Sequence, residues 1–282
     1  MRRFLLLSLL TTLLILPACQ SGEDANDNEQ EQEVTFDPAI IQGTWEMTEN
    51  MPADTNITLP VDYHQYKIYT KDHVFFLAFH PDSNSVGMMG GGTYTINQDS
   101  FTENLTFMSM HEEGNPTSYS FTHKIDATTF AQSGRMESNV EGEEDFMLEE
   151  RYRRVESSIG DGVEGHPYIG LWKLEKTLYG DGELETQADS IHSLKVITPG
   201  HFYIMSSNKN HPEKVNVVFG SQKMEDGKYV ETVIANSWSD EMNGQTIAFS
   251  AEGAPSTFIM KGVMSYEGND NYKIEEHYSR VE

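Results

Sequence analysis

The sequence predicts an all-β fold made of two tandem, eight-stranded, antiparallel up-and-down β-barrels. Two observations carry this prediction: the second half of the chain repeats the first, and each half is a series of short β-type runs. The segment from His64 to Thr70 returns 128 residues later as the segment from His192 to Thr198. A period above about one hundred residues is too long for a solenoid repeat and fits a whole domain. We therefore expect two domains of one fold.

The ends of the two repeats mark the domain boundaries. Each repeat opens with Gly-x-Trp, at Trp45 and at Trp172, and closes with Glu-Glu-x-Tyr-x-Arg, ending at Arg154 and at Arg280. A short Gly-containing connector at residues 157–162 separates the repeats. The predicted barrels span residues 38–157 and 165–282. The connector is short enough that we expect the barrels to touch.

Each repeat contains about eight runs rich in Val, Ile, Thr, Tyr and Phe, separated by turn pairs such as Asp226-Gly227 and Asn243-Gly244. Sequential strands joined by tight turns are satisfied most economically by a closed barrel, because closure leaves no unpaired edge. An open sandwich is the alternative. In the first repeat the runs lie near residues 42–49, 64–70, 73–79, 91–97, 100–109, 117–124, 128–137 and 144–155.

The first 18 residues predict a secretory signal. Arg2 and Arg3 precede an apolar run from Phe4 to Leu16 that is too short to be a stable membrane span. The run ends in Leu-Pro-Ala-Cys, which resembles the lipobox of bacterial lipoproteins, and Cys19 is the only cysteine in the chain. The resemblance implies cleavage before Cys19 and acylation of that residue, which would anchor the protein in a membrane without spanning it.

Residues 19–37 predict a flexible tether, because residues 20–33 carry six acidic and no basic side chains and too little apolar surface to fold. Acidic residues soon after a lipidated cysteine resemble the surface-export signal of Bacteroidetes lipoproteins. We therefore expect an outer-membrane lipoprotein exposed at the cell surface, with the periplasmic face as the alternative. The net charge of −26 argues against nucleic-acid binding, which needs clustered Lys and Arg.

The paired Gly-x-Trp and terminal Arg resemble lipocalin-like barrels, in which Trp closes the base and a basic side chain packs over its ring. On this resemblance Trp45 would pair with Arg154, and Trp172 with Arg280, as structural closures of the two barrels. The His-x-x-Lys-Ile-x-Thr segment and the following Gly-Gly-Gly-Thr-Tyr run also resemble lipocalin-like proteins exported by Bacteroidetes. The second repeat has Phe219-Gly220-Ser221 instead of three glycines, so the two barrels need not hold equivalent ligands.

Strand alternation suggests which polar side chains face the lumen. If the more apolar face of each strand points inward, Glu103 lies inward with Phe101 and Leu105, and His64 lies inward with Tyr66. An Arg and a Tyr on the last strand could orient a ligand head group, or the Arg could simply cover the Trp. The candidate ligand-binding residues are His64, Glu103, Glu150, Tyr152, Arg154, His192, Glu231, Glu276, Tyr278 and Arg280.

Three functional hypotheses follow. The first is a carrier or sensor of a small lipophilic molecule, with a continuous cavity in at least one barrel. The second is a surface module for glycans or envelope proteins, with filled barrels and an exposed aromatic patch near Tyr179 or Trp238. The third is an isomerase or hydrolase in which Glu and His converge inside an open lumen. The ten His residues show no metal-ligand spacing, so neither a metal nor a cofactor is predicted.

Overall fold

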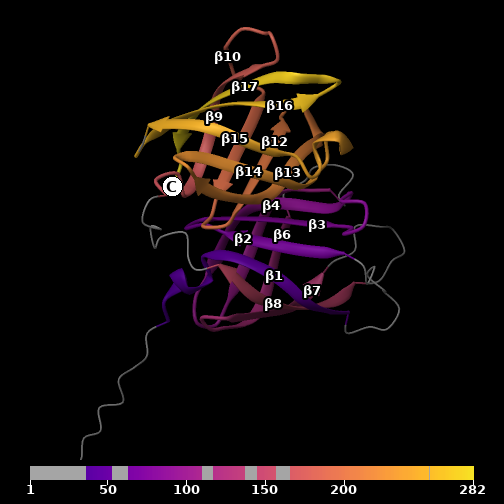
Figure 1. The fold of residues 1–282 in the computed structure, drawn as a ribbon. Helices are drawn as coiled ribbons and strands as arrows, with labels where there is room; N and C mark the ends of the chain where they lie inside the picture. Colours follow the sequence, from indigo (N-terminus) through magenta and orange to yellow (C-terminus); the bar gives the residue numbers. More distant parts are fainter. Residues whose placement is uncertain (1–35, 53–62, 110–116, 137–144, 157–165, 254) are drawn as a thin grey trace, which may run out of the picture. The chain divides into compact units, whose positions relative to one another are not determined.

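The computed structural model describes residues 36–52, 63–109, 117–136, 145–156, 166–253 and 255–282. The predicted signal peptide, Cys19 and nearly all of the tether lie outside the described residues. The described chain from Phe36 to Glu282 is one compact unit that contains both barrels (Figure 1). Helical structure is confined there to two short 3-10 helices, η1 (Pro38–Ile41) and η2 (Asp240–Met242).

Barrel 1 is a closed ring of eight antiparallel strands, in which each strand pairs with the next and β1 pairs with β8. This confirms the predicted fold. Two strands extend several residues beyond the predicted runs. Strand β1 continues for three more residues, which pair with the start of β8. Strand β4 begins five residues earlier, because Val86 to Met89 pair with β3 despite their weak β-type composition. The strands are β1 (Gly43–Pro52), β2 (His64–Tyr69), β3 (His73–Phe79), β4 (Val86–Ile96), β5 (Phe101–Met108), β6 (Thr117–Ile125), β7 (Thr129–Met136) and β8 (Phe146–Glu156).

Barrel 2 repeats this order and closes through pairing of its first strand, β9, with its last, β17. The two-residue strand β10 adds to the edge of β9 outside the ring. The strands are β9 (Gly170–Tyr179), β10 (Glu185–Thr186), β11 (Ile191–Ile197), β12 (His201–Asn208), β13 (His211–Glu225), β14 (Lys228–Asn236), β15 (Thr246–Gly253), β16 (Thr257–Tyr266) and β17 (Asn269–Arg280).

A bulge recurs at the same repeat position in both barrels, at Gly92 and Gly220. A Cβ atom on Gly92 would lie 2.0 Å from the carbonyl oxygen of Asn104, and one on Gly220 would lie 2.1 Å from that of Thr232. No side chain fits at those distances, so the backbone approach requires glycine. The glycine run of the first repeat is thus a bulge and not a phosphate loop.

The outward faces of β2 and β3 are apolar because they pack against barrel 2. The Tyr66 ring lies 4.9 Å from the Phe219 ring between centroids, and the Tyr203 hydroxyl donates to the Phe76 carbonyl oxygen at 3.3 Å. One buried cluster joins side chains from β2, β3 and β5 of barrel 1 to side chains from β9 and β11 to β14 of barrel 2, with Ile68 and Val196 among its members. The more apolar face of β2 and of β3 therefore points away from the lumen of barrel 1.

Candidate functional site

The lumen of barrel 1 holds a buried charged cluster around Lys67. The Lys67 ammonium lies 3.1 Å from Glu103 Oε1 and 3.4 Å from Glu150 Oε2, and all three side chains are about 95% buried. Burial alone would lower the pKa of Lys67, but the two carboxylates raise it above its ordinary value. One cation is therefore shared by two carboxylates.

Amide and phenol donors complete the barrel 1 cluster. Glu150 accepts hydrogen bonds from Gln132 at 2.6 Å, from Tyr152 at 2.7 Å and from Gln65 at 3.4 Å. Tyr69 donates to Glu103 at 2.6 Å. Buried charges are tolerated when they are paired and hydrogen-bonded in this way. The charged groups of the barrel 1 lumen are thus paired with one another and hydrogen-bonded by neighbouring side chains.

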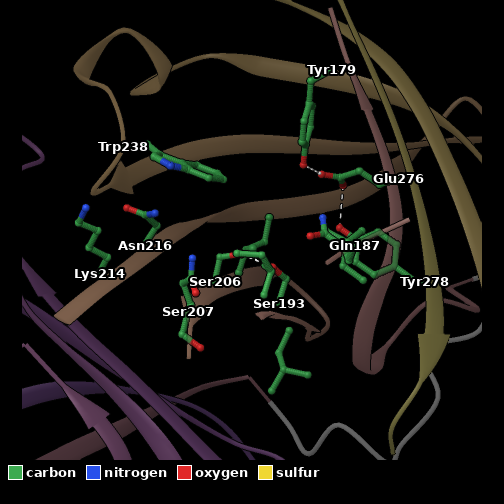
Figure 2. A pocket seen from close by; sticks show the side chains of 15 residues that line it. Tyr179, Gln187, Ser193, Ser206, Ser207, Lys214, Asn216, Trp238, Glu276 and Tyr278 are labelled. Atoms are coloured by element: carbon green, nitrogen blue, oxygen red, sulfur yellow. Dashed lines mark hydrogen bonds between the residues drawn. The ribbon is translucent and has the colours of Figure 1, made fainter. Parts of the chain in front are cut away.

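Barrel 2 keeps the charges but loses the amides. The Lys195 ammonium lies 2.5 Å from Glu231 Oε1 and 3.4 Å from the Met260 sulfur. Burial raises the pKa of Glu231, and Lys195 offsets only part of that effect. Glu276 accepts hydrogen bonds from Tyr179 and Tyr278, both at 2.7 Å (Figure 2).

Burial, together with the adjacent carboxylate, raises the pKa of Tyr179 and of Tyr278 well above the ordinary value of tyrosine. Both phenols therefore stay protonated at neutral pH and act as hydrogen-bond donors.

Four substitutions at matching repeat positions distinguish the barrel 2 lumen, and the first three of them replace a larger side chain with a smaller one. Ser193 stands where barrel 1 has Gln65, Ile204 where it has Phe76, Ile247 where it has Tyr119, and Met260 where it has Gln132. The barrel 1 cavity measures about 110 Å³. Barrel 2 has two cavity lobes of about 330 and 190 Å³. Exchanging large side chains for smaller ones in a close-packed interior leaves such space.

The two lobes of barrel 2 are adjacent and share four lining side chains, Tyr179, Ile204, Trp238 and Glu276. One lobe continues along Leu174, Ser193 and Ser206. The other is mainly apolar and aromatic, and Glu231 is among its lining residues together with Phe202, Val218, Val233, Met242, Ile247, Phe249, Met264, Tyr266, Tyr272 and Ile274. This combination of an apolar wall and a few convergent polar groups is typical of small-molecule sites.

The structure brings six of the predicted site residues into the lumens: Glu103, Glu150 and Tyr152 in barrel 1, and Glu231, Glu276 and Tyr278 in barrel 2. All six are buried. Their positions follow from strand alternation on β5, β8, β14 and β17. The sequence predicted no ion-pair partner for any of the glutamates. In the structure Lys67 pairs with Glu103 and Glu150, and Lys195 pairs with Glu231.

The predicted inward positions of His64 and His192 are wrong. His64 shares the outward face of β2 with Tyr66 and Ile68, lies against Phe79 and is half exposed. His192 is also exposed, although the part of its ring that neighbouring groups cover is enough to lower its pKa. The reason is the contact between the barrels, which makes the outer faces of β2 and β11 the more apolar ones. Assigning the more apolar face to the lumen therefore gives the wrong face for these two strands. The Glu–His convergence expected for an enzyme is therefore not formed by these histidines.

Arg154 and Arg280 lie at the Trp-closed ends of the barrels. The Arg154 guanidinium sits 4.1 Å from the centre of the Trp45 ring, and that of Arg280 sits 4.2 Å from the Trp172 ring. Both tryptophans are fully buried. The nitrogens of Arg154 donate to the carbonyl oxygens of Ala127, Gln42 and Ile40, and those of Arg280 to backbone carbonyls at the matching end of barrel 2. The guanidinium groups are thus engaged in closing the base.

Sequence reasoning missed the two buried lysines, Lys67 and Lys195. Each alternates with apolar residues that pack against the other barrel, so neither appears on the face judged to be inward. One signal could have revealed them: a lysine recurs at the same position of both repeats within an otherwise apolar strand. A repeated lysine in a strand buried on both faces needs a buried anion.

Among the residues that the structure describes, no group of three or more His, Cys, Asp or Glu side chains is arranged to hold a metal ion. In the same residues no helix is long and apolar enough to cross a membrane.

Fold and lumen together define a protein of two tandem lipocalin-like barrels, each closed by an Arg-covered Trp. The chain belongs to the family described as domain of unknown function DUF4488, whose profile matches residues 40–161 and again residues 167–282. The two matches correspond to the two repeats.

Solved structures with similar folds include a lipocalin-like protein from Bacteroides uniformis, at 18% identity and a TM-score of 0.30, over 41% of this chain and 100% of the other. An uncharacterized protein from Bacteroides eggerthii is 19% identical with a TM-score of 0.27, over 40% of this chain and 99% of its own. An uncharacterized protein from Saccharomyces cerevisiae aligns over 85% of this chain and 97% of its own, with 13% identity and a TM-score of 0.49. No protein of curated function matches the sequence.

Proposed function

We propose that the protein is a lipid-anchored binding protein that holds a small, mostly apolar molecule in the lumen of barrel 2. The observation that carries this proposal is the cavity around Glu276, whose larger lobe of about 330 Å³ falls within the size range of small-molecule sites. The apolar wall would hold the body of the ligand. Glu276, Tyr179 and Tyr278 would orient its polar end.

Barrel 1 has a different role in this proposal. Its cavity of about 110 Å³ is too small for a drug-sized molecule, and its carboxylates are satisfied from within. Barrel 1 would instead serve as a rigid support, because its outer face packs against β9 and β11 to β14 of barrel 2. The binding function is therefore assigned to barrel 2 alone.

Anchoring and location belong to the same proposal. The Leu-Pro-Ala-Cys sequence supports lipidation of Cys19, and the acidic residues that follow support display at the outer surface of an outer membrane. A binding protein placed there would meet small lipophilic molecules as they arrive at the cell envelope. Periplasmic display is the alternative, and a membrane-fractionation and surface-proteolysis experiment on intact cells distinguishes the two.

Native mass spectrometry tests the binding function. The chain from Phe36 onward, purified gently from the source organism, should carry added mass that is lost on denaturation. Ile204→Trp would insert an indole where both lobes meet and should remove that mass. Thr95→Trp, on the exposed outer face of β4, is the control and should keep it. An empty protein that also fails to take up apolar probes would favour the alternative, a surface module for glycans or envelope proteins, to be pursued by crosslinking on cells.

A further inference from the structure

We propose that the molecule bound in barrel 2 carries a cationic, amine-type head group that pairs with Glu276. This inference rests on the proposed binding function and specifies the chemical class of the ligand. Three observations support it: the charge balance of the lumen, the hydrogen bonds that barrel 2 has lost, and the aromatic side chains around Glu276.

The charge balance of the barrel 2 lumen leaves one carboxylate without a cation. The lumen contains Glu231, Glu276 and one ammonium, and Lys195 lies 2.5 Å from Glu231. Within the described residues no ammonium or guanidinium lies within ion-pair distance of Glu276. In barrel 1 the equivalent lysine spans both carboxylates, at 3.1 and 3.4 Å. A cation beside Glu276 would restore in barrel 2 the pairing that Lys67 provides in barrel 1.

The lost hydrogen bonds point to the same carboxylate. Glu150 is held by two amide donors and a phenol, whereas Glu276 is held by two phenols. Ser193 and Met260 replace the two amides, and the space that Gln65 fills in barrel 1 belongs in barrel 2 to a cavity lobe that reaches Glu276. Each carboxylate oxygen has two acceptor positions. Glu276 therefore retains capacity to accept further donors from the cavity side.

The aromatic side chains near Glu276 favour a cation over a neutral donor. Figure 2 shows Trp238 across the cavity from Tyr179, with the Tyr179 hydroxyl directed at Glu276. The faces of indole and phenol rings attract ammonium groups, and Trp does so most strongly. Trp238 is 51% exposed and lines both lobes of the cavity. A bound amine would be covered by it.

An anionic head group is disfavoured at this position, because Glu231 and Glu276 both line the cavity. Lys214 is the other charged side chain of the larger lobe. It is exposed, and it lies beside Asn216 on the side of the cavity away from Glu276 (Figure 2). Solvent screens an exposed ammonium more strongly than a buried carboxylate. The chain's net charge of −26 also favours the approach of cations.

Three probes with the same ten-carbon chain test the inference: decylammonium, decanol and decanoate. Their affinities for the chain from Phe36 onward are measured by isothermal titration calorimetry at neutral pH, below micelle formation. We expect decylammonium to bind about tenfold or more tightly than decanol, and decanoate to bind most weakly. Glu276→Gln keeps a side-chain oxygen for Tyr179 and Tyr278 and should bring decylammonium to the affinity of decanol. Glu150→Gln, the matched change in barrel 1, should leave all three affinities unchanged.

The outcomes separate this inference from the proposed function. If decanol or decanoate binds as tightly as decylammonium, the amine inference is wrong while the binding function stands. A preference for decylammonium that survives Glu276→Gln also overturns the assignment to Glu276. If none of the probes binds, the binding function fails and the inference fails with it. Unchanged decanol binding would show that the Glu276→Gln variant is folded. The comparison of the three probes on the unaltered chain tests the inference without depending on any variant.

Discussion

Barrel 1 and barrel 2 share a strand order, a Trp-Arg closure and a buried Lys-Glu pair, yet within the described residues the lumen of barrel 2 is several times larger than that of barrel 1. In barrel 1, Gln65 and Gln132 reach into the lumen and donate hydrogen bonds to Glu150. In barrel 2, Ser193 and Met260 replace them, and the lumen opens around Glu276. The difference shows that a barrel can be converted from a filled core to a cavity by changing a few inward side chains, while its strands and closure stay the same.

Removing the buried ammonium of each barrel should change stability the most. Lys67→Met leaves Glu103 and Glu150 without their shared cation, and should cost barrel 1 about 3–5 kcal/mol of unfolding free energy. Lys195→Met should cost barrel 2 less, because burial already raises the pKa of Glu231 and this carboxyl can take up a proton. Hydrogen exchange resolved by strand, combined with urea unfolding, measures both losses. Equal losses in the two barrels would contradict the view that their lumens differ in electrostatic satisfaction.

A reciprocal exchange of the amide positions should have the next largest effect. Gln65→Ser with Gln132→Met removes two donors from Glu150 and should destabilise barrel 1 by about 1–3 kcal/mol for each unsatisfied group. The opposite pair, Ser193→Gln with Met260→Gln, should fill the barrel 2 lumen, raise its melting temperature and abolish probe binding. Thermal unfolding and calorimetric titration report the two properties separately. Probe binding that is retained in the Ser193→Gln, Met260→Gln variant would show that the binding site lies elsewhere.

The smallest expected effect concerns the contact that links the end of barrel 2 to barrel 1. Glu282 Oε1 lies 2.5 Å from His73 Nδ1, and Glu282 Oε2 accepts from the Lys71 amide at 2.8 Å. Burial alone would raise the pKa of Glu282, but the hydrogen bonds from His73, Thr70 and Lys71 lower it below its ordinary value. Glu282 therefore stabilises the fold above the unfolded pKa of about 4.3 and loses that contribution as the pH falls through the lower, folded pKa.

Glu282→Gln tests this contact. We expect it to lower the unfolding free energy at pH 7 by roughly 0.5–1 kcal/mol and to have less effect near pH 3, which lies below the unfolded pKa of this carboxyl. Glu252→Gln, at an exposed position on β15, serves as the control. Urea unfolding at both pH values measures the difference. A loss that is as large at pH 3 as at pH 7 would argue against a charged contact.

The tandem repeat, the number of strands and the antiparallel order could all be predicted from the sequence, because they depend on local alternation and turn residues. The sequence also located Glu103, Glu150, Glu231 and Glu276, since each lies on a strand whose inward face is clearly the apolar one. The resemblance of Gly-x-Trp and the terminal Arg to lipocalin-like barrels implied the contact between Trp45 and Arg154. In each case the physical signal lies within one strand or one repeat.

The inward face of β2 and β11, and with it the role of the lysines, depends on the contact between the two barrels. Ile68 and Val196 are apolar because each barrel covers the other, so alternation alone assigned His64 and His192 to the wrong side. The size of each lumen was also beyond the sequence, since it depends on how Gln65, Phe76, Tyr119 and Gln132 meet across the ring. Side chains from distant strands converge only when the barrel closes, and their shared volume and charge balance are properties of that closure.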